Sequence, residues 1–150
     1  MKNQFWLFGA KLNILADKVI NKSDIDLIEG VFPAGAQSPL HVHTKYSETL
    51  YVLDGELTVY LPGVQQIVKT GESFHIPTNV PHCLVNSSSE NIFKALAVAH
   101  PGGFAKLIRA VGIFADDNET LISQQHDMKL AADVMAEVGD AILGPPGARP

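Results

Sequence analysis

The feature that most constrains the fold is a series of short apolar or alternating runs, separated by turn residues, over the first hundred residues. The runs are residues 5–7, 27–32, 48–53, 57–61, 65–68, 73–76, 82–86 and 93–98. Short strands divided by glycine, proline and asparagine turns are typical of an all-β sandwich or barrel. Asp54 and Gly55, between two of these runs, predict a tight hairpin at that point.

Beyond Pro101 the apolar residues follow a helical spacing. The first set, at i, i+3, i+4 and i+7, is Phe104, Leu107, Ile108 and Val111. A second helix is predicted over residues 127–138, capped by Asp127 and ended by Gly139, with an apolar stripe of Leu130, Val134 and Val138. We therefore expect a barrel domain with a covering helix over residues 1–115. Residues 116–150 would add a C-terminal helical extension, packed outside the barrel, and a loose tail from Gly144.

Composition limits the class of protein. A hydrophobic fraction of 46% fits a globular chain, and a net charge of −5 leaves no basic footprint for nucleic acid or anionic lipid. The apolar runs are far shorter than the roughly 20 residues of a membrane span. Cys83 is the single cysteine, so no internal disulfide is possible, and its apolar neighbours predict a small core residue. These features favour a cytoplasmic protein.

Four side chains carry the chemistry that the sequence predicts. His41 and His43 are two residues apart, so on a strand both imidazoles point to the same face. Glu48 has the opposite parity, and residues 44–47 must turn or bulge to bring it to the same side. His82 begins a later strand. Three imidazoles and one carboxylate suit one divalent transition metal ion, namely Fe, Mn, Ni, Co, Cu or Zn. Four protein ligands on an ion that accepts six would leave two positions open.

The spacing of these residues resembles the two motifs of the cupin superfamily. The stretch Gly35-x5-His41-x-His43-x4-Glu48-x6-Gly55 matches the first motif at every defining position. The stretch Gly71-x5-Pro77-x-Asn79-x2-His82-x3-Asn86 matches the second, except that Asn79 stands where the family usually has glycine. The resemblance implies a single-domain double-stranded β-helix, or jelly-roll cupin barrel. Inside it, His41, His43, Glu48 and His82 would converge on the metal ion.

A second resemblance concerns the activity. Pro101-Gly102-Gly103-Phe104 before a helix, and the C-terminal stretch 142–146, are similar to bacterial cupins described as quercetin 2,3-dioxygenase-like. This implies a metal-dependent dioxygenase that acts on a small aromatic or enolic substrate, with dioxygen as the second partner. Glu48 would be a metal ligand and could also accept a proton as the catalytic base. A non-catalytic ligand-binding cupin, and an isomerase, lyase or hydrolase that uses the metal as a Lewis acid, remain open alternatives.

Strand parity suggests which residues line the pocket. Leu50 and Val52 share the parity of Glu48 and should face inward. Phe74, His75 and Phe93 are further candidates, with core packing the alternative for the two phenylalanines and an exposed position the alternative for His75. The resemblance also implies a homodimer, and the apolar run 5–8 is a candidate edge for contact with a partner chain.

Overall fold

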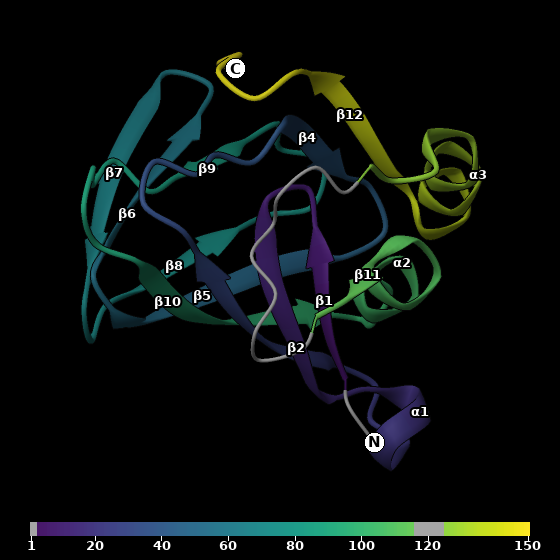
Figure 1. The fold of residues 1–150 in the computed structure, drawn as a ribbon. Coiled ribbons are helices and arrows are strands. Elements are labelled where there is room, and N and C mark those ends of the chain that lie inside the picture. The colour runs from purple at the N-terminus through teal and green to yellow at the C-terminus, as the bar shows by residue number, and fades with distance from the viewer. Residues whose placement is uncertain (1–2, 116–124) are drawn as a thin grey trace.

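The computed structural model describes residues 3–115 and 125–150, and in these ranges the chain is built mainly of antiparallel strands (Figure 1). The largest sheet has seven strands, in the order β11 (Ile113–Phe114), β1 (Gln4–Leu7), β2 (Ala10–Ala16), β3 (Asp26–Phe32), β10 (Phe93–His100), β5 (Ser47–Asp54) and β8 (Ser73–Ile76). Three strands form a second sheet, in the order β7 (Val64–Lys69), β6 (Glu56–Leu61) and β9 (Cys83–Val85). The last pair is β12 (Asp140–Gly144) with β4 (Leu40–His43). The predicted all-β jelly-roll architecture is confirmed.

Alternation along the strands places the core inside the barrel. On β5, Glu48, Leu50 and Val52 are buried, whereas Tyr51 between them is 45% exposed. The inward side chains of β2, β3, β6 and β10 complete a continuous aliphatic and aromatic core. Burial of such side chains contributes about 1.5–3 kcal/mol each relative to exposure, so the inward parity of these strands is fixed by the core.

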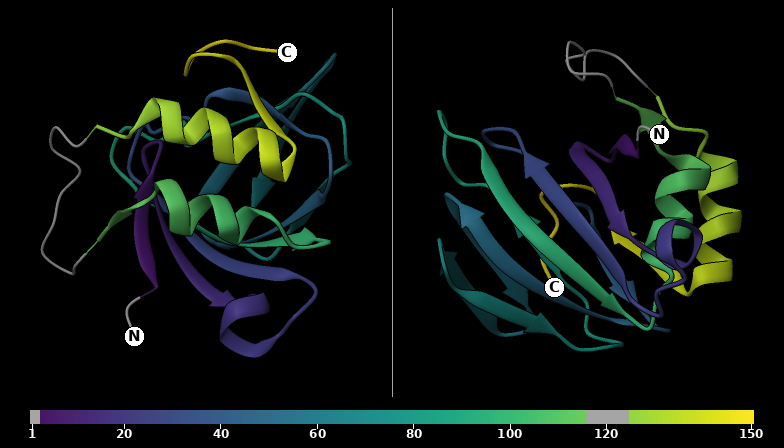
Figure 2. Two further views of the ribbon diagram at one scale, coloured as in Figure 1. Left: turned by 90° about the vertical axis from the view of Figure 1, so that its right-hand side faces the viewer. Right: turned by 90° about the horizontal axis from the view of Figure 1, so that it is seen from below.

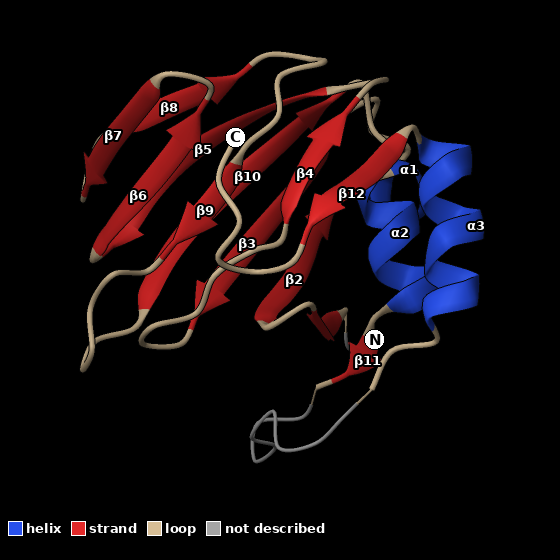
Figure 3. Ribbon diagram, turned by 90° about the horizontal axis from the view of Figure 1, so that it is seen from above, coloured by secondary structure: helices blue, strands red, loops and turns tan. Residues whose placement is uncertain are grey.

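The helices gather on one side of the molecule, and the strands form the rest (Figure 3). They are α1 (Lys18–Asn21), α2 (Phe104–Val111) and α3 (Met128–Val138). Helices α2 and α3 lie side by side against the barrel (Figure 2, left), so the prediction of C-terminal helices packed outside it is confirmed. None of the helices in the described ranges has the length and apolar character of a membrane span.

Helix α3 has the predicted ends, and Val134 and Val138 of the predicted stripe are buried. The Asp127 carboxylate accepts hydrogen bonds from Lys129 N and Leu130 N, and Gly139 ends the helix with a φ of 83°. The predicted stripe was wrong at Leu130, which is 40% exposed. The buried face is Ala131, Val134, Met135 and Val138, which also has the i, i+3, i+4, i+7 spacing. The core of the protein therefore includes Ala131 and Met135 in place of Leu130.

The hairpin predicted at Asp54 and Gly55 is not formed. Strand β5 pairs with β10 and β8, whereas β6 pairs with β7 and β9, so Gly55 carries the chain from one sheet to another. Its φ is +85°, and a Cβ there would lie 2.9 Å from the carbonyl oxygen of Ile92. The glycine is required by this close backbone approach and by the left-handed conformation.

Four strands lay outside the runs predicted from the sequence. These are β2, β4, β11 and β12, although the argument about His41 and His43 assumed a strand at β4. Strand β1 lies between β2 and β11, and its Phe5, Trp6 and Leu7 are buried within the chain. The expected partner-contacting edge at residues 5–8 was therefore wrong, and the homodimer stays a prediction. The domain boundary expected at residue 115 adjoins residues 116–124, which lie outside the described part of the chain, and it also stays a prediction.

Candidate metal centre

The two histidines of β4 lie on one side of their strand, as the parity argument predicted. Their ring centroids are 4.9 Å apart. His43 is 5% exposed. Two imidazoles held next to one another on a single short strand supply half of the candidate ligand set.

His82 is placed opposite His41 by backbone pairing. His41 N donates to the carbonyl oxygen of His82 at 3.0 Å, and His82 N donates to that of His41 at 2.9 Å. Residues paired in this way project their side chains to the same face, and the two ring centroids are 4.2 Å apart. The turn before His82 contains Asn79, whose φ of 67° is the left-handed value for which the family uses glycine. Asparagine adopts this conformation more readily than most residues.

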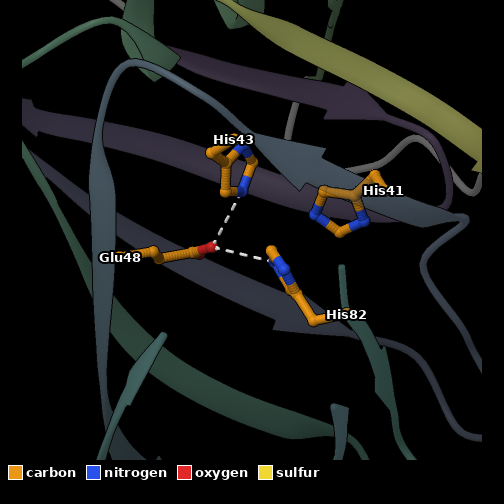
Figure 4. A group of neighbouring side chains, drawn as sticks. All are labelled: His41, His43, Glu48 and His82. Carbon is orange, nitrogen blue, oxygen red and sulfur yellow. Dashed lines mark hydrogen bonds and ion pairs between the residues drawn. The ribbon is translucent and has the colours of Figure 1, made fainter. Parts of the chain in front are cut away.

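Glu48 lies on β5 in the seven-stranded sheet. His41 and His43 lie on β4, and His82 pairs with His41 there. Residues 44–46 form the turn between β4 and β5 that the parity mismatch required. The Oε2 atom of Glu48 lies 3.2 Å from His43 Nε2 and 3.7 Å from His82 Nε2. Figure 4 shows the carboxylate pointing between these two imidazoles, with His41 beside them.

The four residues fit one metal ion. Each offers one ligand atom, and these atoms all lie within 4.8 Å of one another. Metal–ligand bonds of roughly 2.0–2.2 Å put two ligand atoms of one ion at most about 4.4 Å apart. The four ligand atoms would therefore have to move only slightly closer together to bind one ion. His82 Nε2 is buried, points into this cluster and has no hydrogen-bond partner in the structure. An orphaned buried nitrogen is costly, and a metal ion would satisfy it.

Hydrogen bonds at the opposite ring nitrogens prepare the imidazoles for this role. His41 Nδ1 donates to the carbonyl oxygen of Pro39 at 2.7 Å, and His82 Nδ1 donates to that of Val80 at 2.9 Å. A carbonyl oxygen can only accept, so Nδ1 carries the proton in both rings. In the neutral imidazole the lone pair is then on Nε2, the atom that faces the cluster.

The charges of the cluster are strongly coupled. Burial, with His82 and His43 close by, lowers the pKa of His41 to about 3. Burial alone would lower the pKa of His43, but hydrogen bonds to Asp140 and Glu48 raise it to about 9. Burial alone would also raise the pKa of Glu48, but His43 and His82 hold it well below its usual range. At neutral pH the metal-free cluster therefore contains an ionised Glu48, a protonated His43 and a neutral His41.

Two residues beside the cluster were missed by the sequence analysis. Asp140 Oδ1 lies 2.7 Å from His43 Nδ1, and Tyr46 Oη donates to Asp140 Oδ2 at 2.8 Å. Tyr46 lies in the turn between two predicted ligands, a position that could have marked it. Asp140 is 97 residues from His43 in sequence, and no local pattern indicates that β12 pairs with β4.

A cavity of about 110 Å³ adjoins the cluster. His41, His43, Glu48 and Asp140 form its polar end, and the rest of its wall is mainly aliphatic and aromatic. This volume is several times the roughly 10–15 Å³ that one water requires. It is below the roughly 300–1,000 Å³ of sites for drug-sized ligands.

The structure brings two of the five predicted pocket residues to this cavity. Leu50 and Phe93 line it. Val52, Phe74 and His75 do not: Val52 is fully buried in the core, and Phe74 packs against the core from a half-buried position. His75 is exposed on the outer face of β8, where its Nδ1 hydrogen-bonds with Thr49 Oγ1 at 2.8 Å. The inward parity of β8 falls on Ile76, which pairs with Glu48.

Comparison with known proteins agrees with this geometry. The family model described as the cupin domain matches residues 29–99. Quercetin 2,3-dioxygenase of Bacillus subtilis is 30% identical over 111 residues, which cover 71% of this chain and 32% of that protein. The chain spans between 32% and 59% of the lengths of three relatives matched by sequence.

Solved structures share the barrel. An RmlC-like cupin from Shewanella frigidimarina is 24% identical with a TM-score of 0.57, over 67% of this chain and 85% of that one. The polyketide cyclase RemF from Streptomyces resistomycificus is 25% identical with a TM-score of 0.55, over 65% of this chain and 67% of that one. With two motifs in place, a His/Glu cluster able to bind a metal ion and the family match over residues 29–99, the chain belongs to the cupin superfamily.

Proposed function

We propose that this chain is a metal-dependent dioxygenase that acts on a small aromatic or enolic molecule. The observation that carries the proposal is that the ligand cluster forms one end of an apolar cavity. His41, His43 and Glu48 line that cavity together with Leu50 and Phe93. A purely structural site has no need of such an opening, because its ligands close around the ion.

The chain's own residues define what the site can do with a substrate. His41, His43, His82 and Glu48 would hold the ion, which would supply Lewis-acid activation of a substrate hydroxyl and electron transfer to dioxygen. The apolar wall would orient the organic part of the substrate and exclude water. Glu48 is ionised in the metal-free cluster, which suits it to bind the ion. Its proposed second role is to take the proton of a substrate hydroxyl.

The size of the cavity restricts the substrate class. With about 110 Å³ available next to the cluster, the proposal is for a compact molecule, with one ring or a short enol. Such a molecule would carry two adjacent oxygens for the metal end and an apolar body for the remainder of the cavity.

The comparisons support this activity and also one competitor. The sequence match to quercetin 2,3-dioxygenase favours oxygenase chemistry. The structural match to a polyketide cyclase at 25% identity favours a cyclisation. In this chain such a reaction would use the ion only as a Lewis acid, without dioxygen. The two candidates differ in their need for dioxygen and for a redox-active ion.

The test is an oxygen-electrode assay on protein loaded separately with Fe, Mn, Ni, Co, Cu or Zn. The substrates are one-ring ortho-hydroxy carbonyl compounds, short 1,3-diketones and three-ring flavonols. We expect oxygen uptake equal to substrate loss with a redox-active ion, and faster turnover of the compact compounds. The matched controls are His41→Ala, which removes a ligand, and His75→Ala, which removes an exposed histidine.

Three outcomes decide between the alternatives. Oxygen uptake that is lost in His41→Ala and kept in His75→Ala supports the dioxygenase. Turnover that continues without oxygen, with zinc as effective as iron, assigns the Lewis-acid reaction instead. A tight ligand with no turnover in any metal form assigns a binding protein and overturns the proposal.

A further inference from the structure

A carboxylate from the C-terminal segment touches one of the candidate ligands. Asp140 is the first residue of β12, which lies beyond residues 29–99 that match the cupin domain. Its Cα is the register partner of the His43 Cα in the β4–β12 pair. Its Oδ1 atom lies 2.7 Å from His43 Nδ1, and the residue is 7% exposed.

The other oxygen of Asp140 is also occupied. Tyr46 Oη donates to Oδ2 at 2.8 Å, and Tyr46 is 1% exposed. The Tyr46 ring stacks on the His43 imidazole, with centroids 4.5 Å apart and planes at 25°. The imidazole is thus held along its edge by a carboxylate and across its face by an aromatic ring, and neither contact uses the Nε2 atom.

Asp140 distinguishes His43 from the other two imidazoles. His41 and His82 each donate Nδ1–H to a backbone carbonyl, whereas His43 faces a carboxylate. A charged acceptor makes a shorter and stronger hydrogen bond than a neutral one and increases electron donation from the opposite nitrogen. Of the three imidazoles, His43 is therefore the one with the most strongly fixed orientation.

The position of Asp140 is itself set by contacts around the preceding turn. The carbonyl oxygen of Gly139 accepts from Thr44 N at 2.8 Å and from Thr44 Oγ1 at 2.6 Å. Lys45 Nζ donates to the carbonyl oxygen of Glu137 at 3.0 Å. The segment directly after His43 is thus attached to the end of α3. These contacts fix the register that puts Asp140 opposite His43.

We propose that Asp140 is a positioning residue of the metal centre, which holds His43 so that Nε2 faces the ion. It follows that the metal affinity of the barrel depends on a segment at the other end of the chain. The inference rests on the metal centre of the proposed function, but it does not depend on which reaction the centre performs.

The test compares Asp140→Asn with Asp133→Asn. The amide keeps the size of the side chain but replaces the charged acceptor. Asp133 lies on the exposed face of α3, so its replacement removes the same charge without touching the cluster. Loss of an outer hydrogen-bond partner typically lowers metal affinity by about 10–100-fold. We expect a loss of that size for Asp140→Asn by calorimetric titration with Co²⁺, with changed visible cobalt bands. Asp133→Asn should match the wild type in both.

A second variant keeps the inference testable if Asp140→Asn does not fold. Tyr46→Phe preserves the stacked ring and removes the hydroxyl that holds Asp140, so it should lower Co²⁺ affinity by a few-fold and shift the same bands. Wild-type affinity and bands in whichever of these variants folds would overturn the proposal. Failure of the wild type to bind Co²⁺ would refute the metal centre itself, whereas Co²⁺ binding without oxygen uptake would refute only the dioxygenase.

Discussion

Replacing His82 by leucine should separate metal binding from folding. The imidazole is fully buried, and leucine has a similar volume. Its Nδ1 donates to the Val80 carbonyl oxygen at 2.9 Å, and its Nε2 has no hydrogen-bond partner. The substitution therefore removes one satisfied and one unsatisfied polar atom at the same time.

In the metal-free protein these two effects oppose one another. A buried polar group without a partner costs about 1–3 kcal/mol. Leucine removes this cost at Nε2 but leaves the Val80 carbonyl oxygen without its donor, which is a cost of similar size. The free energy of unfolding of the metal-free variant should therefore stay within about 2 kcal/mol of the wild-type value.

In the presence of metal the two proteins should differ strongly. An ion at a thousand times its Kd stabilises the folded state by about 4 kcal/mol. Since 1 kcal/mol moves Tm by roughly 2–4 °C in a domain of this size, the wild type should gain roughly 8–16 °C. His82→Leu should lose most of that gain, because one of the four ligands is missing.

The assay is thermal unfolding with and without a saturating ion, with His75→Leu as the matched control. His75 is an exposed histidine on β8, so its variant should keep the full metal-dependent shift. The reasoning would be refuted if His82→Leu kept the metal-dependent increase in Tm of the wild type. It would also be refuted if both variants lost that increase equally. If the metal-free His82→Leu protein failed to fold, the cost of the unpaired Nε2 atom would be smaller than the cost of leaving the Val80 carbonyl oxygen without a donor.

Three further predictions follow from the same geometry. Because the pKa of His43 is about 9 without metal, metal binding at pH 7.5 should release about one proton, and the affinity for the ion should weaken as the pH falls. Proton release should vanish above about pH 9. Calorimetric titration in buffers of different ionisation enthalpy measures the released protons, and binding that is independent of pH would contradict the prediction. Asn86→Leu should lower the free energy of unfolding by about 1–3 kcal/mol in urea, because the buried amide donates to three backbone carbonyls, including that of Phe32 at 3.1 Å; the metal stoichiometry should not change. Ala97→Leu should reduce turnover and leave the metal-dependent Tm shift intact, because Ala97 lines the cavity and is not in the ligand cluster; loss of the Tm shift would show that the substitution disturbs the ligands.

Sequence patterns predicted the barrel well because its strands bury one face each. The alternation of Glu48, Leu50 and Val52 with an exposed Tyr51 follows directly from this. The same reasoning brought His41 and His43 to one face. The Asp54 and Gly55 prediction failed for a different reason. A left-handed glycine permits a tight hairpin, but it equally permits a passage between two sheets, and the local sequence is the same in both cases.

Contacts between distant segments could not be predicted by parity alone. Parity states which face a side chain occupies, but register decides its neighbours. His41 meets His82 because their backbones pair directly, and Asp140 meets His43 because β12 joins β4. For His82 the motif spacing supplied the missing information. For Asp140 no motif exists, so a short strand after a helix carried no signal of its partner.

The residues that line the cavity come both from the stretch that carries the motifs and from the segments on either side of it. Leu50, Phe93 and all four ligands lie within the stretch that matches the cupin domain, and three of those ligands, His41, His43 and Glu48, line the cavity. Leu12 on β2, Phe104 and Leu107 on α2 and Met135 on α3 line the same cavity from outside that stretch. The segments that carry the motif therefore determine which ion can bind, because they hold the ligands. The segments before and after it limit the shape of the organic molecule, because they close the apolar end. Chains with the same four ligands and different terminal segments should consequently accept different substrates, and their affinity for the ion should depend on whether a carboxylate faces the histidine equivalent to His43.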